Sequence, residues 1–321
     1  MKIADKTYLI DGLDLGLEQR TGIYVLEGDE LTIIETGPSC SYEPIVKGLK
    51  ELGYTLDDLL HIIVTHVHLD HAGGAGQLMQ HTKNATLHVH PKGAKHLNDP
   101  TKLIQGAKVV YGDKFDDLFA PVLPCPVEHT VSHEDESVLQ IAADRKLTFL
   151  HTPGHALHHF SIQDELTGAI FTGDTLGIYY GRLSQKMGTC IAIPSTSPSQ
   201  FDEQSMLTSW ERIKSLNPAI IGFGHFGVST DQQEVFQSLH SSYDVFKTVL
   251  SQEHVDPTRL SHLLFEALLE HFSIENHDDD VQMMKMDCEV SALGLIDAYR
   301  KVESDLSVEE VAKGRYNGLR D

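Results

Sequence analysis

Cysteine is scarce in this chain of 321 residues, and its four copies lie far apart without a C-x-x-C pair. They are Cys40, Cys125, Cys190 and Cys288. A disulfide framework and a cysteine-rich zinc site both need thiols at characteristic spacings, so the sequence argues against both. We therefore expect reduced thiols and a cytoplasmic protein.

Long apolar runs and a basic surface are also missing. No segment reaches the roughly 18 apolar residues of a membrane span, and the first residues contain no signal-peptide core. The chain has 25 Lys and Arg against 47 Asp and Glu, a formal charge of −22. Nucleic-acid binding needs clustered basic residues to neutralise phosphates. We therefore expect a small-molecule substrate, with neither nucleic acid nor membrane as a partner.

Histidine, by contrast, is abundant, with 20 copies. Three of them and an aspartate fall within six residues in "HVHLDH", directly after the apolar run "LLHIIVT". Imidazole and carboxylate without cysteine suit Zn²⁺, with iron or manganese as alternatives. In an extended segment His66 and His68 point the same way, while Asp70 and His71 can reach a neighbouring position. The segment predicts a metal site with room for two ions.

The same arrangement returns three times further along the chain. The apolar strands in "LTFLHTPGH", "GAIFTGDT" and "PAIIGFGH" each end in a turn that presents His155, Asp174 or His225. Ligands in α/β sheets collect beyond the carboxyl ends of strands, so these residues can converge. Seven ligands are too many for one tetrahedral ion but fit two ions that share a carboxylate. The seven candidates are His66, His68, Asp70, His71, His155, Asp174 and His225.

Strands and helices alternate over residues 1–235. Short strands in "TYLIDG", "GIYVLEG" and "LTIIETG" give way to helical spacing in "YEPIVKGLKELGY". This alternation predicts an α/β layered fold. Residues 236–321 carry apolar residues at helical spacing and predict a helical C-terminal extension. Its apolar faces must be covered either by the main domain, at the edge that carries the site, or by a second chain in a homodimer.

These motifs resemble the metallo-β-lactamase superfamily, and in particular a poorly characterised bacterial and archaeal branch of it. The matching segments are "THVHLDHAGG" at 65–74, "TPGH" at 152–155, "FTGD" at 171–174 and "GHFG" at 224–227. The resemblance implies an αββα four-layer sandwich with a catalytic domain over residues 1–235. It also implies two ligand groups, which are His66, His68 and His155 for one ion and Asp70, His71 and His225 for the other, with Asp174 bridging them.

The activity that the resemblance implies is that of a dinuclear zinc hydrolase. A metal-bridging hydroxide would attack a small ester, thioester or lactone. Asp70, beside both ions, is expected to orient the nucleophile or to pass a proton to the leaving group. Tyr179, and with it Tyr180, is a candidate hydrogen-bond donor to the developing oxyanion.

Two other activities stay open at this point. An iron-dependent sulfur dioxygenase resembles these hydrolases in its histidine ligands and would bind iron and consume oxygen. A tRNA-processing nuclease shares the site but needs a basic surface, which the charge of −22 disfavours.

The chain also departs from the better-known branches. "GHFGVS" replaces the "GHEYT" type of segment found in hydroxyacylglutathione hydrolases, and Gly177 stands where quorum-signal lactonases place a tyrosine. Glu35 stands before "TG" where the family often has aspartate.

Several other residues carry secondary expectations. His158 and His159 are either partners of the metal ligands or simply polar residues near the site. Structural roles are expected for His88, His90 and His96. The resemblance places Asp99 and Tyr111 near the pocket.

Overall fold

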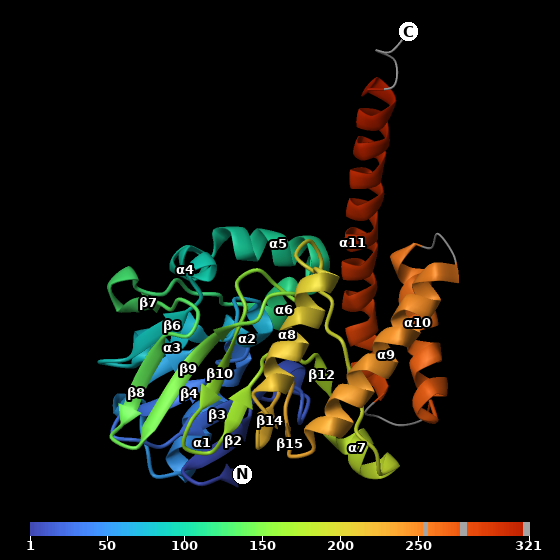
Figure 1. The fold of residues 1–321 in the computed structure, drawn as a ribbon. Coiled ribbons are helices and arrows are strands. Elements are labelled where there is room, and N and C mark those ends of the chain that lie inside the picture. Colours follow the sequence, from blue (N-terminus) through green and yellow to red (C-terminus); the bar gives the residue numbers. More distant parts are fainter. Residues whose placement is uncertain (253–255, 277–280, 317–321) are drawn as a thin grey trace.

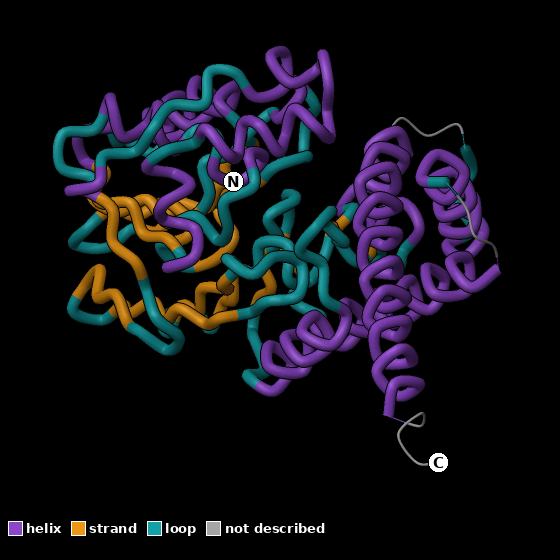
Figure 2. The backbone as a smooth tube through the Cα atoms, turned by 90° about the horizontal axis from the view of Figure 1, so that it is seen from above, coloured by secondary structure: helices purple, strands orange, loops and turns teal. Residues whose placement is uncertain are grey.

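The computed structural model describes residues 1–252, 256–276 and 281–316, and its strands form two stacked sheets between helices (Figures 1 and 2). The first sheet has the strand order β1-β2-β3-β4-β5-β6-β7, antiparallel from β1 to β4 and parallel from β4 to β7. Its strands are β1 (Lys2–Ala4), β2 (Thr7–Asp11), β3 (Gly22–Leu26), β4 (Leu31–Ile34), β5 (Leu59–Ile63), β6 (Thr86–Val89) and β7 (Thr130–Ser132).

The second sheet has the order β15-β14-β11-β10-β9-β8, in which only β11 and β14 pair in parallel. Its strands are β8 (Val138–Ala142), β9 (Arg145–His151), β10 (Phe160–Asp164), β11 (Ala169–Phe171), β14 (Ile220–Gly222) and β15 (Val228–Ser229). A separate two-stranded ribbon consists of β12 (Ile178–Tyr179) and β13 (Ala192–Ile193).

The helices cover the outer faces of the sheets and form the C-terminal part. They are α1 (Tyr42–Glu51), α2 (Leu69–Ala72), α3 (Ala75–His81), α4 (Pro91–Asn98), α5 (Thr101–Tyr111), α6 (Phe115–Phe119), α7 (Gly181–Met187), α8 (Glu203–Ser215), α9 (Gln232–Gln252), α10 (Pro257–Phe272) and α11 (Val281–Tyr316). Within the described residues, none of these helices combines the length and the apolar character needed to cross a membrane.

Alternating side chains along the strands produce the layers. In β3, Ile23 and Val25 join the apolar cluster under α1, α3 and α4, whereas Tyr24 and Leu26 join the cluster between the two sheets. Successive residues of a strand point to opposite faces, so one buried strand serves two layers. On the far side of the second sheet, Trp210 of α8 packs in a third cluster. The αββα sandwich predicted from the sequence is thereby confirmed.

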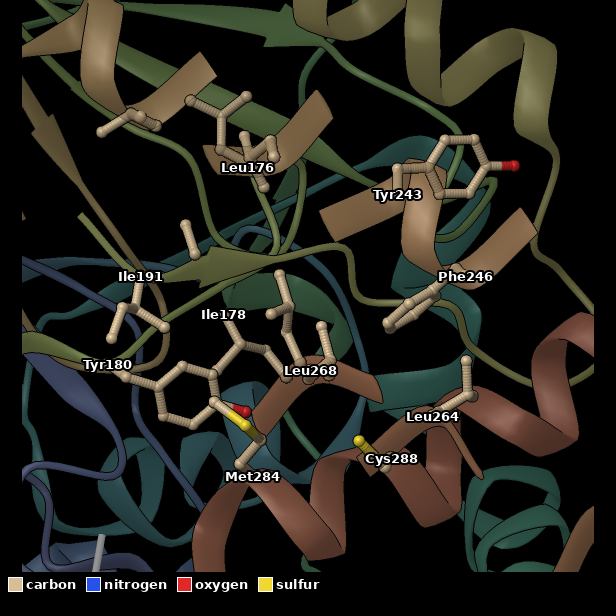
Figure 3. Packing of buried hydrophobic residues seen from close by; sticks show 14 of the residues in the cluster. Leu176, Ile178, Tyr180, Ile191, Tyr243, Phe246, Leu264, Leu268, Met284 and Cys288 are labelled. Atoms are coloured by element: carbon tan, nitrogen blue, oxygen red, sulfur yellow. The ribbon is translucent and has the colours of Figure 1, made fainter. Parts of the chain in front are cut away.

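The helical extension packs against the main domain. Helices α9, α10 and α11 share one apolar cluster with the ribbon β12-β13, in which Ile178, Phe246, Leu268 and Met284 lie together (Figure 3). Helix α9 begins at Gln232, slightly before the predicted boundary at 236. This packing corresponds to the first of the two arrangements expected for the apolar faces. The homodimer stays a prediction.

A buried ion pair links the two sheets at one edge. Arg145 on β9 and Asp164 on β10 are both fully buried, with Nη2 of the guanidinium 2.7 Å from Oδ2 of the carboxylate. The guanidinium also donates hydrogen bonds to the carbonyl oxygens of Lys6 and Glu27 and to the hydroxyl of Thr7, which belong to the first sheet and its loops. A single side chain thus satisfies polar groups of both sheets.

We predict that Arg145→Met lowers the free energy of unfolding by about 3–5 kcal/mol, because Asp164 is left as an unpaired buried charge. Urea titration of both proteins measures the change. The matched control is Lys146→Met, an exposed neighbour on the same strand, which should change stability by less than about 0.5 kcal/mol. A loss under about 1 kcal/mol for Arg145→Met would show that the pair contributes little.

Candidate metal centre

The seven predicted ligands lie together at one edge of the sandwich, beyond the carboxyl ends of four strands. His66 and His68 follow β5, while Asp70 and His71 lie on the short helix α2 that comes next. Strand β9 leads to the turn that carries His155. Asp174 follows β11 and His225 follows β14. Because β11 and β14 are parallel neighbours, their ends meet at the same place.

The first group of ligand atoms belongs to three histidines. Nδ1 of His68 lies 3.0 Å from Nε2 of His66 and 2.9 Å from Nε2 of His155. Burial lowers the pKa of His66 and of His68 well below the usual value of histidine. Both rings are therefore neutral at physiological pH and keep a lone pair for a metal ion.

The second group combines two imidazoles with the carboxylate of Asp70. Oδ2 of Asp70 lies 3.6 Å from Nε2 of His71 and 3.7 Å from Nε2 of His225. The ligand atoms of these three residues all lie within 4.8 Å of one another. The Asp70 side chain is 25% exposed, so this group is open to the cavity above it.

Asp174 lies between the two groups. Its Oδ1 is 3.0 Å from Nε2 of His71 and 3.5 Å from Nε2 of His225, while its Oδ2 is 3.5 Å from Nε2 of His155. Burial alone would raise the pKa of Asp174, but these imidazoles hold that pKa well below its usual value. The buried carboxylate is therefore ionised, with one oxygen toward each group.

The donor set fits divalent cations. Nε2 of His71 and Oδ1 of Asp174 are buried and, although they lie 3.0 Å apart, neither has a partner in hydrogen-bond geometry among the described residues. Buried polar atoms are normally satisfied, so such a pair of orphans indicates a missing partner. Histidine nitrogen and carboxylate oxygen are the ligands that zinc, iron and manganese accept.

The second nitrogen of several ligands is held by a neighbour. Nδ1 of His155 lies 2.9 Å from the carbonyl oxygen of Ser195, and Nδ1 of His71 lies 3.1 Å from Oε1 of Glu35. Such contacts fix the tautomer, since a ring that donates through Nδ1 keeps its Nε2 lone pair for the metal.

Glu35 is a residue whose role the sequence did not reveal. It is buried, it accepts a hydrogen bond from the hydroxyl of Thr65, and its backbone adopts a left-handed conformation with φ 70°. That conformation is unfavourable for a residue with a side chain and is typical of functional sites. Glu35 thus contacts both Thr65, which lies just after β5, and His71. The signals in the sequence were its position immediately after the strand β4 and before "TG", where the family often has aspartate.

Two glycines make room for the ligands. A Cβ at Gly224 would lie 2.6 Å from Cε1 of His71, and a Cβ at Gly173 would lie 2.3 Å from the hydroxyl of Thr65. Gly173 also has φ 47°. Only glycine permits this approach of the backbone to the buried rings.

His158 and His159 both contact the surroundings of the ligands. Nε2 of His159 accepts a hydrogen bond from the backbone N–H of Asp174 at 3.0 Å. Nδ1 of His158 accepts one from the backbone N–H of Val67, between two ligands, at 3.4 Å. These rings position the backbone that carries the ligands.

The three histidines for which structural roles were expected, His88, His90 and His96, have different surroundings. His88 lies in a row of imidazoles, 2.8 Å from Nδ1 of His61 and 2.7 Å from Nε2 of His133. His90 accepts a hydrogen bond from the backbone N–H of Lys92 at the start of α4. His96, by contrast, lines the cavity over the candidate metal centre.

A cavity of about 520 Å³ opens over the ligands. His68, Asp70, His155, Asp174 and His225 contribute to its floor. Small-molecule sites commonly have volumes between about 300 and 1,000 Å³.

Of the two residues expected near the pocket, Tyr111 lines the large cavity and Asp99 does not. Tyr111 lines the large cavity, whereas Tyr179 lines a smaller one beside His225 and stacks on Phe223 with ring centroids 4.8 Å apart. Tyr180 is buried and donates a hydrogen bond to Asp287 of α11. Asp99 is exposed and accepts a hydrogen bond from the backbone N–H of Thr101 at the start of α5.

Residues 16–225, which contain all seven candidate ligands, match the family model described as the metallo-beta-lactamase superfamily. The chain belongs to this superfamily. A similar member is the metallo-beta-lactamase fold-containing protein ST1585 of Sulfurisphaera tokodaii, 29% identical over 210 residues that span 64% of this chain and 72% of ST1585. The crystal structure of ST1585 superposes with a TM-score of 0.65 at 23% identity, covering 90% of this chain and 97% of that one.

Two other superfamily members with sequence similarity carry the names of hydrolases. An N-acyl homoserine lactonase of Bacillus is 26% identical over 186 residues, which span 56% of this chain and 61% of the lactonase. The acyl-coenzyme A thioesterase MBLAC2 of Homo sapiens is 25% identical over 197 residues, which span 53% of this chain and 66% of the thioesterase.

We predict that Glu35→Gln weakens metal binding about 10- to 100-fold, because the amide no longer holds the Nδ1 proton of His71 as a carboxylate does. Competition with a zinc-binding dye measures the affinity. Glu43→Gln, an exposed change on α1, is the matched control and should leave the affinity unaltered. Equal affinities for all three proteins would exclude this role of Glu35.

Proposed function

We propose that this protein hydrolyses a small ester, thioester or lactone with two zinc ions held by the candidate metal centre. The observation that carries the proposal is Asp174, whose two buried oxygens face two separate groups of ligand atoms. Superfamily membership, an intact donor set and relatives named as hydrolases together make the chain a metal-dependent hydrolase. The zinc ions, their number, the substrate class and the cytoplasmic location are our proposals.

The metal ligands in this proposal are the seven predicted residues. His66, His68 and His155 would hold one ion, Asp70, His71 and His225 the other, and Asp174 would contact both. Bound there, two divalent cations supply Lewis acidity and lower the pKa of bound water toward neutrality.

Asp70 is the group that we propose to handle protons. It is the most exposed of the three carboxylates at the centre, at 25%, compared with 3% for Asp174 and 1% for Glu35. A proton acceptor must be accessible to the substrate. Asp70 meets this condition because it lines the cavity over the candidate metal centre. It would orient the nucleophile and then pass the proton to the leaving group.

Tyr111 is better placed than Tyr179 to donate a hydrogen bond to the oxyanion. It lines the same cavity as Asp70 and Asp174, which Tyr179 does not. Burial and the negative charge of Asp70 raise the pKa of Tyr111, so its hydroxyl is protonated at neutral pH. A neutral phenol in a cavity wall is a suitable donor to developing negative charge.

The first test replaces the shared carboxylate. In Asp174→Asn we expect the bound metal to fall from about two ions to at most about one per chain, and hydrolysis of a panel of esters, thioesters and lactones to fall at least about 100-fold. Plasma mass spectrometry and the panel measure the two quantities. Glu128→Gln, at an exposed carboxylate, is the control. Full activity of Asp174→Asn would refute the assigned site.

The second test compares the two tyrosines. Tyr111→Phe should lower kcat about 100-fold with unchanged metal content, because the hydroxyl acts on the transition state alone. Tyr179→Phe should change kcat less than about threefold, since its ring stacks on Phe223 away from the large cavity. The opposite ranking would return the oxyanion role to Tyr179.

A further inference from the structure

We propose that the cavity over the metal centre is a cleft for an apolar acyl group, so that the preferred substrate is an ester, thioester or lactone of a medium-chain aliphatic acid. This inference rests on the proposed hydrolysis and specifies its substrate class. The cleft lies between α5 and α11, which both contribute residues to its lining. In Figure 1, α5 lies across the top of the sheets and α11 stands upright to their right.

One wall of the cleft is an apolar stripe on α5. Leu103, Gly106, Ala107 and Val110 line the cavity at spacings of three and four residues, which places them on one face of the helix. None of the residues of α5 is fully buried by the protein itself. An apolar helix face that borders a cavity gains stability when a ligand covers it.

The opposite wall is formed by Asp287, Val290 and Ser291 of α11, and Val290 is its apolar side chain. This helix is fixed in place at two points. Asp287 accepts hydrogen bonds from the hydroxyl of Tyr180 at 2.7 Å and from Nη2 of Arg20 at 3.2 Å. The hydroxyl of Thr196 donates to the carbonyl oxygen of Ser291 at 2.8 Å. The wall therefore belongs to the folded core, and the cleft has a defined width.

The base of the cleft connects the apolar walls to the ligands. Leu69, Phe119 and Ile178 line it, and Leu69 stands in the chain between His68 and Asp70. The acyl chain of a substrate whose carbonyl group lies at the metal centre would therefore extend along apolar side chains. Lys102 and Gln200 line the same cavity and provide a polar part that suits a hydrated leaving group.

Substitution of Gly106 can test the cleft without disturbing the fold. A Cβ at this position meets no atom within 4 Å, so a larger side chain would enter open space. Leucine also has a higher helix propensity than glycine. Gly106→Leu should thus fold and shorten the space for the acyl chain. Gln105→Leu adds the same side chain at an exposed position that does not line the cavity.

The experiment measures kcat/KM for p-nitrophenyl acetate, butyrate and octanoate with the zinc-loaded protein. In the wild type the octanoate ester should exceed the acetate ester at least about tenfold, because each buried methylene adds affinity. Gly106→Leu should lower this octanoate-to-acetate ratio at least about tenfold. Gln105→Leu should keep the wild-type ratio. Equal values for the three esters in the wild type, or an unchanged ratio in Gly106→Leu, would overturn the cleft.

Two further measurements distinguish a wrong assignment of the cleft to the acyl group from a failure of the proposed function. Octyl acetate places the chain on the alcohol side, and a length preference on that side alone would overturn the assignment to the acyl group. If the wild type hydrolyses none of the esters, thioesters and lactones of the panel, the proposed function fails, and calorimetric titration with 2-hexanone and 2-decanone then tests the cleft by itself. Tighter binding of 2-decanone, by about threefold per methylene and lost in Gly106→Leu, would support it. Equal or absent binding would overturn it.

Discussion

The buried negative charge of Asp174 is the constraint on which the rest of the site depends. An ionised carboxylate inside a protein needs compensation by paired charge or by coordinated metal. Here the compensation comes from the imidazoles of His71, His155 and His225, which reach the carboxylate from the ends of three other strands. Glycine stands at 173 and 224 because this convergence leaves no room there for a side chain. The sandwich serves to bring these turns together.

The C-terminal helices extend this arrangement toward the substrate. Helix α11 shares the apolar cluster of the ribbon β12-β13, and Asp287 on the same helix accepts a hydrogen bond from Arg20, which lines the cavity. Helix α5 borders the cavity from the other side and contributes Tyr111. In our proposal, chemistry and selectivity therefore come from different parts of the chain. The turns of the sandwich supply the ligands, and two helices supply the walls.

Local patterns explain how much the sequence could predict. Each ligand follows an apolar strand and a short turn, so its position relative to the sheet is fixed within a few residues of sequence. Continuous apolar runs such as "GIYVL" of β3 likewise predict strands that are covered on both faces. The contacts of Glu35 with Thr65 and His71, and the contact of Arg20 with Asp287, depend instead on how distant segments pack. No local spacing predicts a contact between residues 20 and 287, nor the stacking of Tyr179 on Phe223.

Metal analysis of the purified protein tests the central claim most directly. Tag-free protein is equilibrated with zinc, freed of unbound metal and measured by plasma mass spectrometry. The two groups of ligand atoms that share Asp174 predict about two zinc ions per chain. No retained metal would contradict the assigned centre. About one iron per chain in protein purified without added metal, with oxygen uptake in place of hydrolysis, would contradict the dinuclear zinc hydrolase and favour the dioxygenase chemistry.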